Sequence, residues 1–402
     1  MSKRGAVEPT TVSDTAPSRS RLASPWAFHE FFAGGGMARL GLGSRWRCVF
    51  ANEICEKKAA AYRSNFGPSP ELRVEDVWRL KPADVPAKVM LAWGSFPCQD
   101  LSLAGNGSGL AGARSGTFVP FWRLVNAKRP PLAALENVAG IFTTNQGRDF
   151  TALFKAITRS GYRAGALLID AVHFVPQSRP RVFVVALRND VPVPPGLQLD
   201  GPDPLWHPPK LVRAACALKK SGCGRAWVWW RLPAPPVRRT TLASMVEAEP
   251  SGVAWHSAEE TQRLVSMMSE RHQQKLRQAQ ASGAKVAGTL YRRMRQDGNG
   301  SRVQRAEVRF DGVSGCLRTP SGGSSRQSVL MVERDSVRSR LLSAREAARL
   351  MGLPDSYNLP ERYNDAYHVA GDGVVVPAVS WLEEYLLAPL ARAARGALSG
   401  PC

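Results

Sequence analysis

The sequence lacks the features of a secreted, metal-binding or membrane-spanning protein. Its seven cysteines form no CxxC pair and no paired framework. With an odd cysteine count and no secretory signal, we expect reduced thiols and a cytoplasmic location. Cys216 and Cys223 have no further ligands at metal-binding spacing, so we expect no bound metal. No apolar run approaches the ~18 residues that a membrane-spanning helix needs.

Acidic residues are scarce relative to basic ones. The chain has 54 Lys and Arg against 33 Asp and Glu, a formal net charge of +21. This excess points to a polyanionic partner, nucleic acid ahead of an anionic membrane surface. Residues 201–310 alone hold 19 basic and 8 acidic side chains, a net of +11. More than half of the excess therefore lies in one part of the chain.

The first strand-to-helix turn lacks the GxGxxG spacing of a dinucleotide fold, which disfavours a hydride-transfer enzyme. The stretch FFAGGGMARLG at 31–41 is instead a glycine-rich turn from strand to helix, where a ligand can approach the backbone. Glu53, about twenty residues on, suits the two hydroxyls of a ribose, and Asp76 at the next strand end could accept a hydrogen bond from an adenine amino group. Either acid alone is typical of a solvated loop. Both after successive strands indicate a nucleoside pocket.

Strands and helices alternate through the first half of the chain. Residues 1–24 are rich in Ser, Thr, Pro and Arg, and we expect them to form a disordered tail. Strands are predicted at 27–32, 47–53, 89–93, 132–137, 166–170 and 181–187, a further strand end at 74–78, and helices at 55–66 and 149–159. This alternation predicts an α/β fold with a doubly wound, mostly parallel sheet that binds ligands at the carboxyl ends of its strands.

Proline and tryptophan residues interrupt this rhythm after residue 191. We predict a first domain at 25–194, a smaller, largely irregular domain inserted at 195–314, and a return to the first domain at 315–402. In the insertion, the capping box of Ser257 and Glu260 predicts a helix at 256–280, which a basic segment at 291–310 follows. Beyond it, Ser343 and Glu346 predict a helix at 343–352, and a C-terminal helix is expected at 374–395.

The stretch GSFPCQD at 94–100 places Cys98 after a buried strand and Pro97, and before a Gly/Ser/Ala-rich segment at 102–116. Most lone cysteines are small buried hydrophobes, but a thiol on a stiff turn at a strand end is placed for chemistry. Glu136 follows four apolar residues, so burial should favour its protonated form. A thiol and a protonatable acid at adjacent strand ends indicate covalent catalysis.

A third candidate element is QSRPRVF at 177–183. Arg179 and Arg181 occupy alternate positions as the chain enters a strand, which puts both guanidinium groups on one face. A solvated sheet edge would explain such a pair, but two arginines on one face near the site also suit a phosphate or a base carbonyl.

The chain carries a series of short motifs that resembles the ordered motifs of the DNA cytosine-5 methyltransferases of bacterial modification type. In chain order these motifs are FFAGGGMARLG, ANE, ED, GSFPCQDLS, LENV, QSRPR, LRTPSGGSSRQ and AGDGVV. The resemblance covers nearly all of 26–390 except the basic insertion, and PCQ, ENV and QxRxR in that order are highly specific together. It implies the S-adenosylmethionine-dependent methyltransferase fold, with the insertion as the target-recognition domain.

The resemblance also implies roles for single residues. Residues expected to bind S-adenosyl-L-methionine are Phe32, Gly34, Gly36, Glu53, Asp76, Val77, Pro97, Phe118 and Asp372. Cys98 is expected to add to C6 of a flipped-out cytosine while Glu136 protonates N3, which makes C5 able to take a methyl group. Residues expected to contact the base or the DNA are Arg179, Arg181, Gln99, Ser102, Arg114, Gln177, Arg292, Arg293, Arg295 and Arg318, with Arg302 and Arg305 as further candidates.

Three sites depart from the family pattern. Asp372 and Gly373 replace the usual Asn-Ser/Ala, Met37 stands where a further glycine is common, and residues 100–101 replace the usual Pro-Phe. None removes a catalytic group, so we expect an active, monomeric enzyme that modifies a specific double-stranded DNA sequence, with a restriction-modification system as the usual setting, and with neither a membrane nor a metal as partner.

Two alternatives stay open: a catalytically silent DNA-binding protein on the same scaffold, and a transfer-RNA cytosine methyltransferase. The intact set of Cys98, Glu136 and Arg179 argues against the first. The absence of the Cys-Phe-Thr tripeptide of the transfer-RNA branch, together with the basic insertion, argues against the second.

Overall fold

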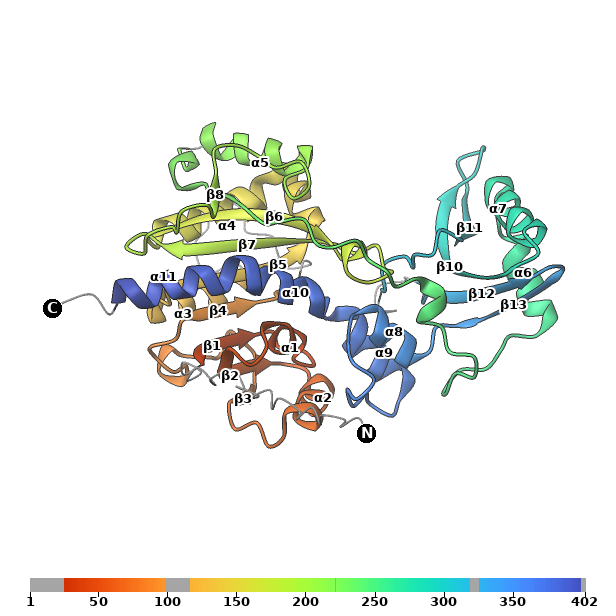
Figure 1. The fold of residues 1–402 in the computed structure, drawn as a ribbon, viewed down its shortest axis with the longest axis horizontal. Coiled ribbons are helices and arrows are strands. Elements are labelled where there is room, and N and C mark those ends of the chain that lie inside the picture. The colour runs from red at the N-terminus through yellow and green to blue at the C-terminus, as the bar shows by residue number, and fades with distance from the viewer. Residues whose placement is uncertain (1–24, 98–115, 221, 319–324, 399–402) are drawn as a thin grey trace, which may run out of the picture.

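The computed structural model describes residues 25–97, 116–220, 222–318 and 325–398. The expected tail at 1–24 lies outside them. Two sheets organise the chain: a large one of seven strands and a second one of four, which lie in two lobes joined by extended segments (Figure 1).

The large sheet has the strand order β3-β2-β1-β4-β5-β7-β6. Its first five strands pair in parallel, while β7 runs antiparallel to both β5 and β6. The strands are β1 (Trp26–Phe31), β2 (Trp46–Glu53), β3 (Leu72–Val74), β4 (Leu91–Gly94), β5 (Leu132–Val138), β6 (Tyr162–Asp170) and β7 (Pro180–Arg188). The expected doubly wound, mostly parallel sheet is confirmed.

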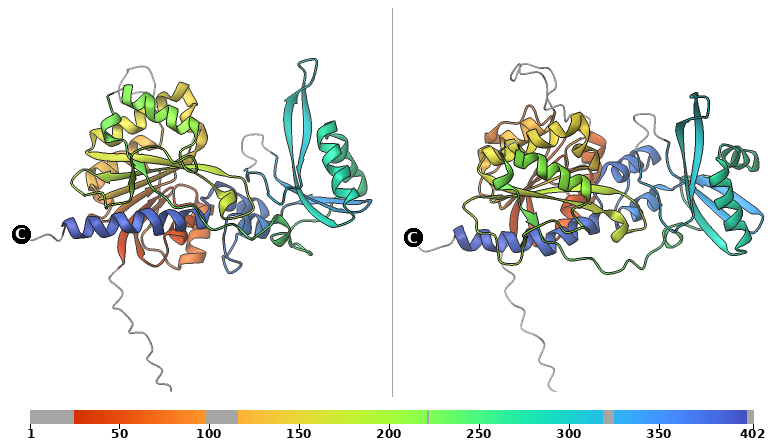
Figure 2. Two further views of the ribbon diagram at one scale, coloured as in Figure 1. Left: turned by 45° about the horizontal axis from the view of Figure 1, so that its top comes forward. Right: turned by 90° about the horizontal axis from the view of Figure 1, so that it is seen from above.

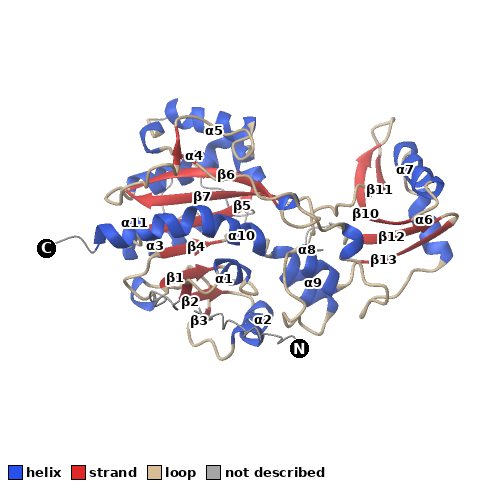
Figure 3. Cartoon of the chain, in the orientation of Figure 1, coloured by secondary structure: helices blue, strands red, loops and turns tan. Residues whose placement is uncertain are grey.

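Apolar runs form the central strands because both faces of the sheet are covered (Figure 3). Alternation along β4 sends Trp93 into one hydrophobic cluster and Ala92 into the other. The first cluster includes α1 (Met37–Leu42), α2 (Glu56–Phe66), α8 (Ala344–Leu350), α9 (Tyr363–Asp372), α10 (Val376–Leu382) and α11 (Ala388–Leu398). The second includes α3 (Phe118–Lys128), α4 (Arg148–Arg159) and α5 (Pro209–Lys220).

The C-terminal helices return to the first strands, as expected. A Cβ on Gly41 of α1 would lie 2.5 Å from Cβ of Val379 in α10, so these helices are in close contact. The indole of Trp46 donates a hydrogen bond of 2.8 Å to buried Glu383, in the π-helical turn Glu383–Leu387 between α10 and α11. By length and composition the helical run Tyr363–Ala397 could cross a membrane. However, 61% of its apolar 18-residue stretch is buried inside the protein, which is typical of a core helix.

The second sheet is antiparallel, with the order β11-β10-β12-β13. Its strands are β10 (Lys285–Gln296), β11 (Arg302–Arg309), β12 (Ser328–Glu333) and β13 (Ser336–Leu341), and α6 (Ala258–Ser266) and α7 (Glu270–Ala281) cover one face. The β10–β11 hairpin projects beyond the other two strands (Figure 2). The expectation of a largely irregular insertion is therefore wrong.

The predicted single helix at 256–280 is also wrong, because the chain breaks between α6 and α7. Ser257 and Glu260 form the expected capping box at the start of α6. Ser269 then takes an extended conformation (φ −71°, ψ 160°) as the N-cap of α7. The second predicted capping box, Ser343 with Glu346, is confirmed at the start of α8.

The second lobe does not begin at residue 195. Helix α5 and the short strands β8 (Gln198–Leu199) and β9 (Trp229–Trp230) pack against the large sheet, where the Trp230 indole donates a hydrogen bond of 3.0 Å to the Val185 carbonyl. In the other direction, β12 and β13 extend the second sheet to Leu341. We propose that the inserted domain starts after these tryptophan contacts and ends near Leu341.

Candidate active site

A cavity of about 470 Å³ lies at the carboxyl ends of the parallel strands. We call it the strand-end cavity. Its walls come from the turn after β1, the ends of β2, β4 and β5, the start of β7 and the segment after α9. The strand order reverses between β1 and β4, and this is the point where open α/β sheets bind their ligands.

The glycine-rich turn after β1 forms one wall of the strand-end cavity. Gly34 has φ +56°, and none of the described residues has an atom within 4 Å of a Cβ built on it. Its N–H donates a hydrogen bond of 2.8 Å to Glu53. Gly36 has a different reason to be glycine, because its Cβ would lie 2.2 Å from Phe66. Gly34 therefore leaves room for a ligand, whereas Gly36 lies behind the wall and allows the turn to pack.

Two acidic side chains, Glu53 and Glu30, also line the strand-end cavity. Glu53 is 7% exposed, and its other oxygen accepts hydrogen bonds from the backbone N–H groups of Ile54 (3.1 Å) and Cys55 (2.9 Å). Glu30 is 1% exposed, and its Oε2 has no partner in the described part of the chain. Burial raises the pKa of Glu30 to about 8. A fixed carboxylate and an unpartnered buried oxygen fit a ligand with hydroxyl and cationic groups, as S-adenosyl-L-methionine has.

Glu136 lies at the end of β5 and is 8% exposed. Its Oε1 lies 3.1 Å from Nε of Arg181. Burial raises the pKa of Glu136, and it outweighs the opposing effects of Arg181, Arg179 and Ser95. The side chain therefore holds a proton more readily than an exposed glutamate, as the sequence predicted, with a cation beside it to stabilise the charged form after proton transfer.

Asn137, which the sequence analysis did not single out, positions the chain before Cys98. Its Nδ2 donates a hydrogen bond of 3.0 Å to the carbonyl of Phe96, while its Oδ1 accepts one of 2.8 Å from the N–H of Val138. Pro97, predicted as a cofactor residue, lines the strand-end cavity. Cys98, Gln99, Ser102 and Arg114 lie outside the described residues.

Arg179 has a different environment from the one expected. It lines the strand-end cavity, but it is 2% exposed and its guanidinium donates to the carbonyls of Gly371 (2.7 Å), Gly373 (2.8 Å) and Leu317 (3.1 Å). Burial lowers the pKa of Arg179 to about 10. The guanidinium therefore holds together chain segments that are distant in sequence. With these donors engaged in this way, Arg179 fits a structural role better than a phosphate contact.

Cys316 is a cysteine in contact with Arg179. Nη1 of Arg179 lies 3.4 Å from its sulfur. Burial opposes ionisation of Cys316, but Arg179 and Arg181 outweigh that effect and hold its pKa below the usual range. No motif signalled this residue in the sequence, because its environment comes from side chains more than 130 positions away.

Gln177 cannot contact DNA as predicted. The side chain is fully buried, its Nε2 donates a hydrogen bond of 2.7 Å to the Leu350 carbonyl, and its Oε1 accepts one of 3.1 Å from the N–H of Leu317. Both polar ends are therefore engaged in the packing of α8 against the segment between β11 and β12. Gln177 is a positioning residue at the junction of the lobes.

Four of the predicted cofactor residues do not line the strand-end cavity: Gly36, which lies behind its wall, and Val77, Phe118 and Asp76. Val77 and Phe118 are buried in the adjoining hydrophobic cluster, where the Phe118 ring lies 5.6 Å from the ring of cavity-lining Phe96. Asp76 is half-buried and accepts a hydrogen bond of 3.0 Å from the N–H of Trp78. Phe32, Gly34, Glu53, Pro97 and Asp372 do line it.

Asp372 pairs with a lysine that the sequence analysis missed. The Lys58 ammonium lies 2.7 Å from the Asp372 carboxylate, and both side chains line the strand-end cavity. Lys58 is on α2, in a helix that the sequence predicted, but nothing in its spacing indicated the partner more than 300 residues away. The family's asparagine is thus replaced by one half of an ion pair.

The predicted DNA-contacting arginines lie on the β10–β11 hairpin and beside it. Arg293 stacks on Tyr291 and, like Arg295, pairs with Glu307 across the strands. Arg305 lies directly opposite Arg293. Arg292 points to the other face of β10, and Arg318 is exposed in the segment after β11. The face of Tyr291 and Arg293 is not covered by α6 and α7, and it turns toward the first lobe (Figure 1).

Comparison with known proteins gives a consistent result. The model of the family "C-5 cytosine-specific DNA methylase" matches residues 26–387. The Type II methyltransferase M1.ScrFI of Lactococcus lactis subsp. cremoris is 24% identical over 93% of this chain and 81% of its own. The corresponding values for M.NlaX of Neisseria lactamica are 26%, 90% and 96%. The crystal structure of S. pombe Dnmt2 has the same fold (TM-score 0.55, 18% identity, 91% of this chain and 99% of that one).

Proposed function

The chain belongs to the C-5 cytosine-specific DNA methylase family and is a DNA cytosine-5 methyltransferase that uses S-adenosyl-L-methionine, and we propose that it modifies one cytosine within a specific duplex sequence. The observation that supports this most is the position of Glu136. This buried acid, with its raised pKa, shares one cavity with the glycine turn and Glu53.

Bound S-adenosyl-L-methionine supplies an electrophilic methyl group. Gly34 would leave the space it needs, Glu53 would hold its ribose, and Glu30 would add a buried polar oxygen. We propose that Pro97 and the strand-end cavity present the thiol of Cys98 to C6 of the cytosine. A thiolate suits this reversible addition, because it is a stronger nucleophile than an alcohol at neutral pH.

Glu136 is proposed to give a proton to N3 as Cys98 adds to C6. The electron pair of the C5–C6 double bond then becomes available at C5, which forms the new bond to the methyl group as the bond between that methyl group and the sulfonium sulfur breaks. Loss of the C5 proton to water restores the double bond and expels the Cys98 thiolate. N3 gives its proton back to Glu136, which returns the enzyme to its starting state. Arg181 balances the carboxylate that Glu136 becomes, because its Nε lies 3.1 Å away.

Sequence specificity is proposed to lie in the second lobe. The hairpin face of Tyr291, Arg293, Arg295 and Arg305 offers guanidinium groups of the kind that read guanine in the major groove or hold phosphates. Pairing with Glu307 orients Arg293 and Arg295. The target cytosine must still leave the duplex to reach Glu136, at a cost of a few kcal/mol.

The test is transfer of labelled methyl groups from S-adenosyl-L-methionine to duplex DNA. Wild-type protein should label DNA at cytosine C5, while Cys98→Ala should not, because the covalent step is lost. Transfer RNA serves as the competing acceptor. Labelling of transfer RNA in preference to DNA, or equal labelling by wild type and Cys98→Ala, contradicts the proposal. The soluble, monomeric state that we propose for the enzyme is tested by sedimentation of the purified protein, and its cytoplasmic location by fractionation of cells that express it.

A further inference from the structure

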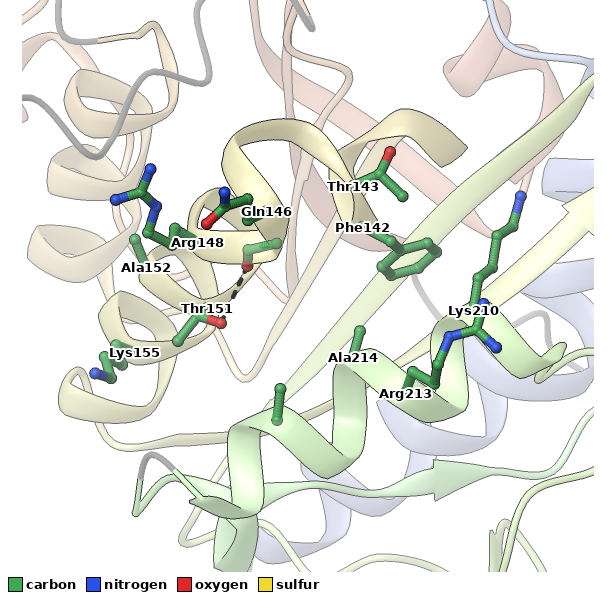
Figure 4. Close-up of a pocket in the computed structure, with 12 residues that line it drawn as sticks. Phe142, Thr143, Gln146, Arg148, Thr151, Ala152, Lys155, Lys210, Arg213 and Ala214 are labelled. Atoms are coloured by element: carbon green, nitrogen blue, oxygen red, sulfur yellow. Dashed lines mark hydrogen bonds between the residues drawn. The ribbon is translucent and has the colours of Figure 1, made fainter.

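A second cavity, of about 430 Å³, lies between α4 and α5 (Figure 4). Two matched helical stripes form its walls, and we call it the basic groove. The stripe of α4 consists of Arg148, Thr151, Ala152 and Lys155, and that of α5 of Lys210, Arg213, Ala214 and Ala217. Both follow the i, i+3, i+4, i+7 spacing of one helix face. The apolar part of its lining comes from Ala152, Ala214, Ala217 and Phe142.

The charge in the basic groove has one sign. It is lined by four cations and no carboxylate. In the described part of the chain, no carboxylate lies within ion-pair distance of any of the four. The one acid of α4, Asp149, is fully buried and accepts hydrogen bonds from Asn145. Facing cations without counter-charges raise the local potential and favour a polyanion with regularly spaced charges.

The basic groove lies close in sequence to the proposed catalytic residue Glu136. Phe142 follows Glu136 by six residues, through the 3-10 turn Ala139–Phe142. A fully extended chain of that length spans at most ~20 Å, and a helical stripe of seven residues adds ~10 Å. At 3.4 Å per base step, the far end of the groove is thus within about nine base pairs of the target cytosine.

We propose that the basic groove binds the phosphodiester backbone of the substrate DNA outside the recognition sequence. Lys155, Lys210 and Arg213 then contact phosphates of the flanking duplex, while Gln146, exposed at the mouth, offers a neutral donor. This inference rests on the proposed function, since it concerns where the same DNA is held. It extends the DNA-binding surface to a helix, α5, that lies outside the second lobe.

The test combines a triple variant with duplexes of increasing flank length. Lys155→Gln/Lys210→Gln/Arg213→Gln leaves Arg148 in place, because its Nε donates a hydrogen bond to the Asn145 carbonyl. The matched control is Arg159→Gln/Lys220→Gln, which removes exposed cations of the same two helices outside the groove. Binding is measured by fluorescence anisotropy between 50 and 200 mM salt, with flanks from four to fifteen base pairs.

For wild type and control, affinity should rise with flank length and level off by about nine base pairs. The triple variant should lose this rise, bind the longest duplex about tenfold more weakly and show a salt slope smaller by about 2.7, since three phosphate contacts are lost and each contributes ~0.9. A triple variant that keeps the length dependence and slope of the control overturns the proposal. Wild-type protein that binds duplex but transfers no methyl group contradicts the proposed function instead, and the slopes still decide the groove.

Discussion

A Cβ atom on Gly373 would lie 2.0 Å from the sulfur of Met37. Two departures from the family pattern therefore occupy the same space: the methionine fills the volume that a serine or alanine side chain at 373 would take. Both residues line the strand-end cavity. The pair keeps the wall of the cavity packed, although neither residue is the usual one.

Gly373→Ala should destabilise the protein by about 1–3 kcal/mol, because overpacking forces Met37 to move. The same substitution in a Met37→Gly background should cost less than half as much, since the space is then free. Chemical denaturation of the two single variants and the double variant measures this coupling.

Gly201→Ala is the control, because no atom lies within 4 Å of its Cβ position, and it should be neutral. Strictly additive effects of Met37→Gly and Gly373→Ala would show that the two departures are unrelated.

Asp372→Asn should weaken binding of S-adenosyl-L-methionine about threefold by leaving the Lys58 ammonium without its partner at the cavity wall. The cofactor carries a sulfonium cation, so the loss should be smaller for S-adenosylhomocysteine, whose sulfur is neutral. Isothermal titration calorimetry with both ligands measures the difference.

Asp365→Asn is a matched control. It breaks the neighbouring pair with Lys57, at 2.9 Å, which does not line the strand-end cavity. If Asp372→Asn weakens both ligands equally, or no more than Asp365→Asn, the charge of Asp372 plays no part in cofactor binding.

Glu30 should make the stability of the protein depend on pH. Its folded pKa, about 8, lies above the value of 4.5 that an exposed glutamate has. Its contribution is therefore fully present below pH 4.5 and is lost as the pH rises through about 8. Relative to wild type, Glu30→Gln should gain stability by a few kcal/mol between pH 5 and pH 8. Urea denaturation of both proteins at the two pH values checks this, and a constant difference contradicts it.

Glu136→Gln should lower kcat by about 10²–10⁴-fold, because an amide cannot give a proton to N3. In wild type the rate of methyl transfer should fall toward alkaline pH, since catalysis needs the protonated acid and burial raises the pKa of Glu136. Single-turnover rates across pH measure both effects. Binding of S-adenosyl-L-methionine by the variant is the control for folding. If Glu136→Gln transfers methyl groups as fast as wild type, Glu136 has no proton-donating role.

The strand ends could be predicted from the sequence because burial leaves a clear pattern there. Glu53 and Glu136 each end an apolar run, and the carboxyl ends of neighbouring parallel strands meet at one edge. Spacing also placed Arg179 and Arg181 on one face. It could not say that Arg179 would meet the carbonyls of residues 371 and 373, because those contacts depend on how distant segments pack.

The second lobe was harder to predict, and the reason is local. Strand β10 is exposed on both faces over its outer half, so it lacks the period-two alternation that indicates a strand. The break between α6 and α7 had a signal, Ser269 followed by Glu270, that resembles a second helix start. The helix α5 has a regular apolar stripe as well, but the prolines before it and the glycines and tryptophans after it obscured it.

The central claim is that Cys98 and Glu136 methylate cytosine C5 in one specific duplex sequence. Bisulfite sequencing of DNA from cells that express the wild-type protein tests it most directly, with cells that express Cys98→Ala as the control. The account predicts protected cytosines at a single shared sequence motif in the first sample and none in the second. Protected cytosines scattered without a common motif, or the same pattern in both samples, would contradict it.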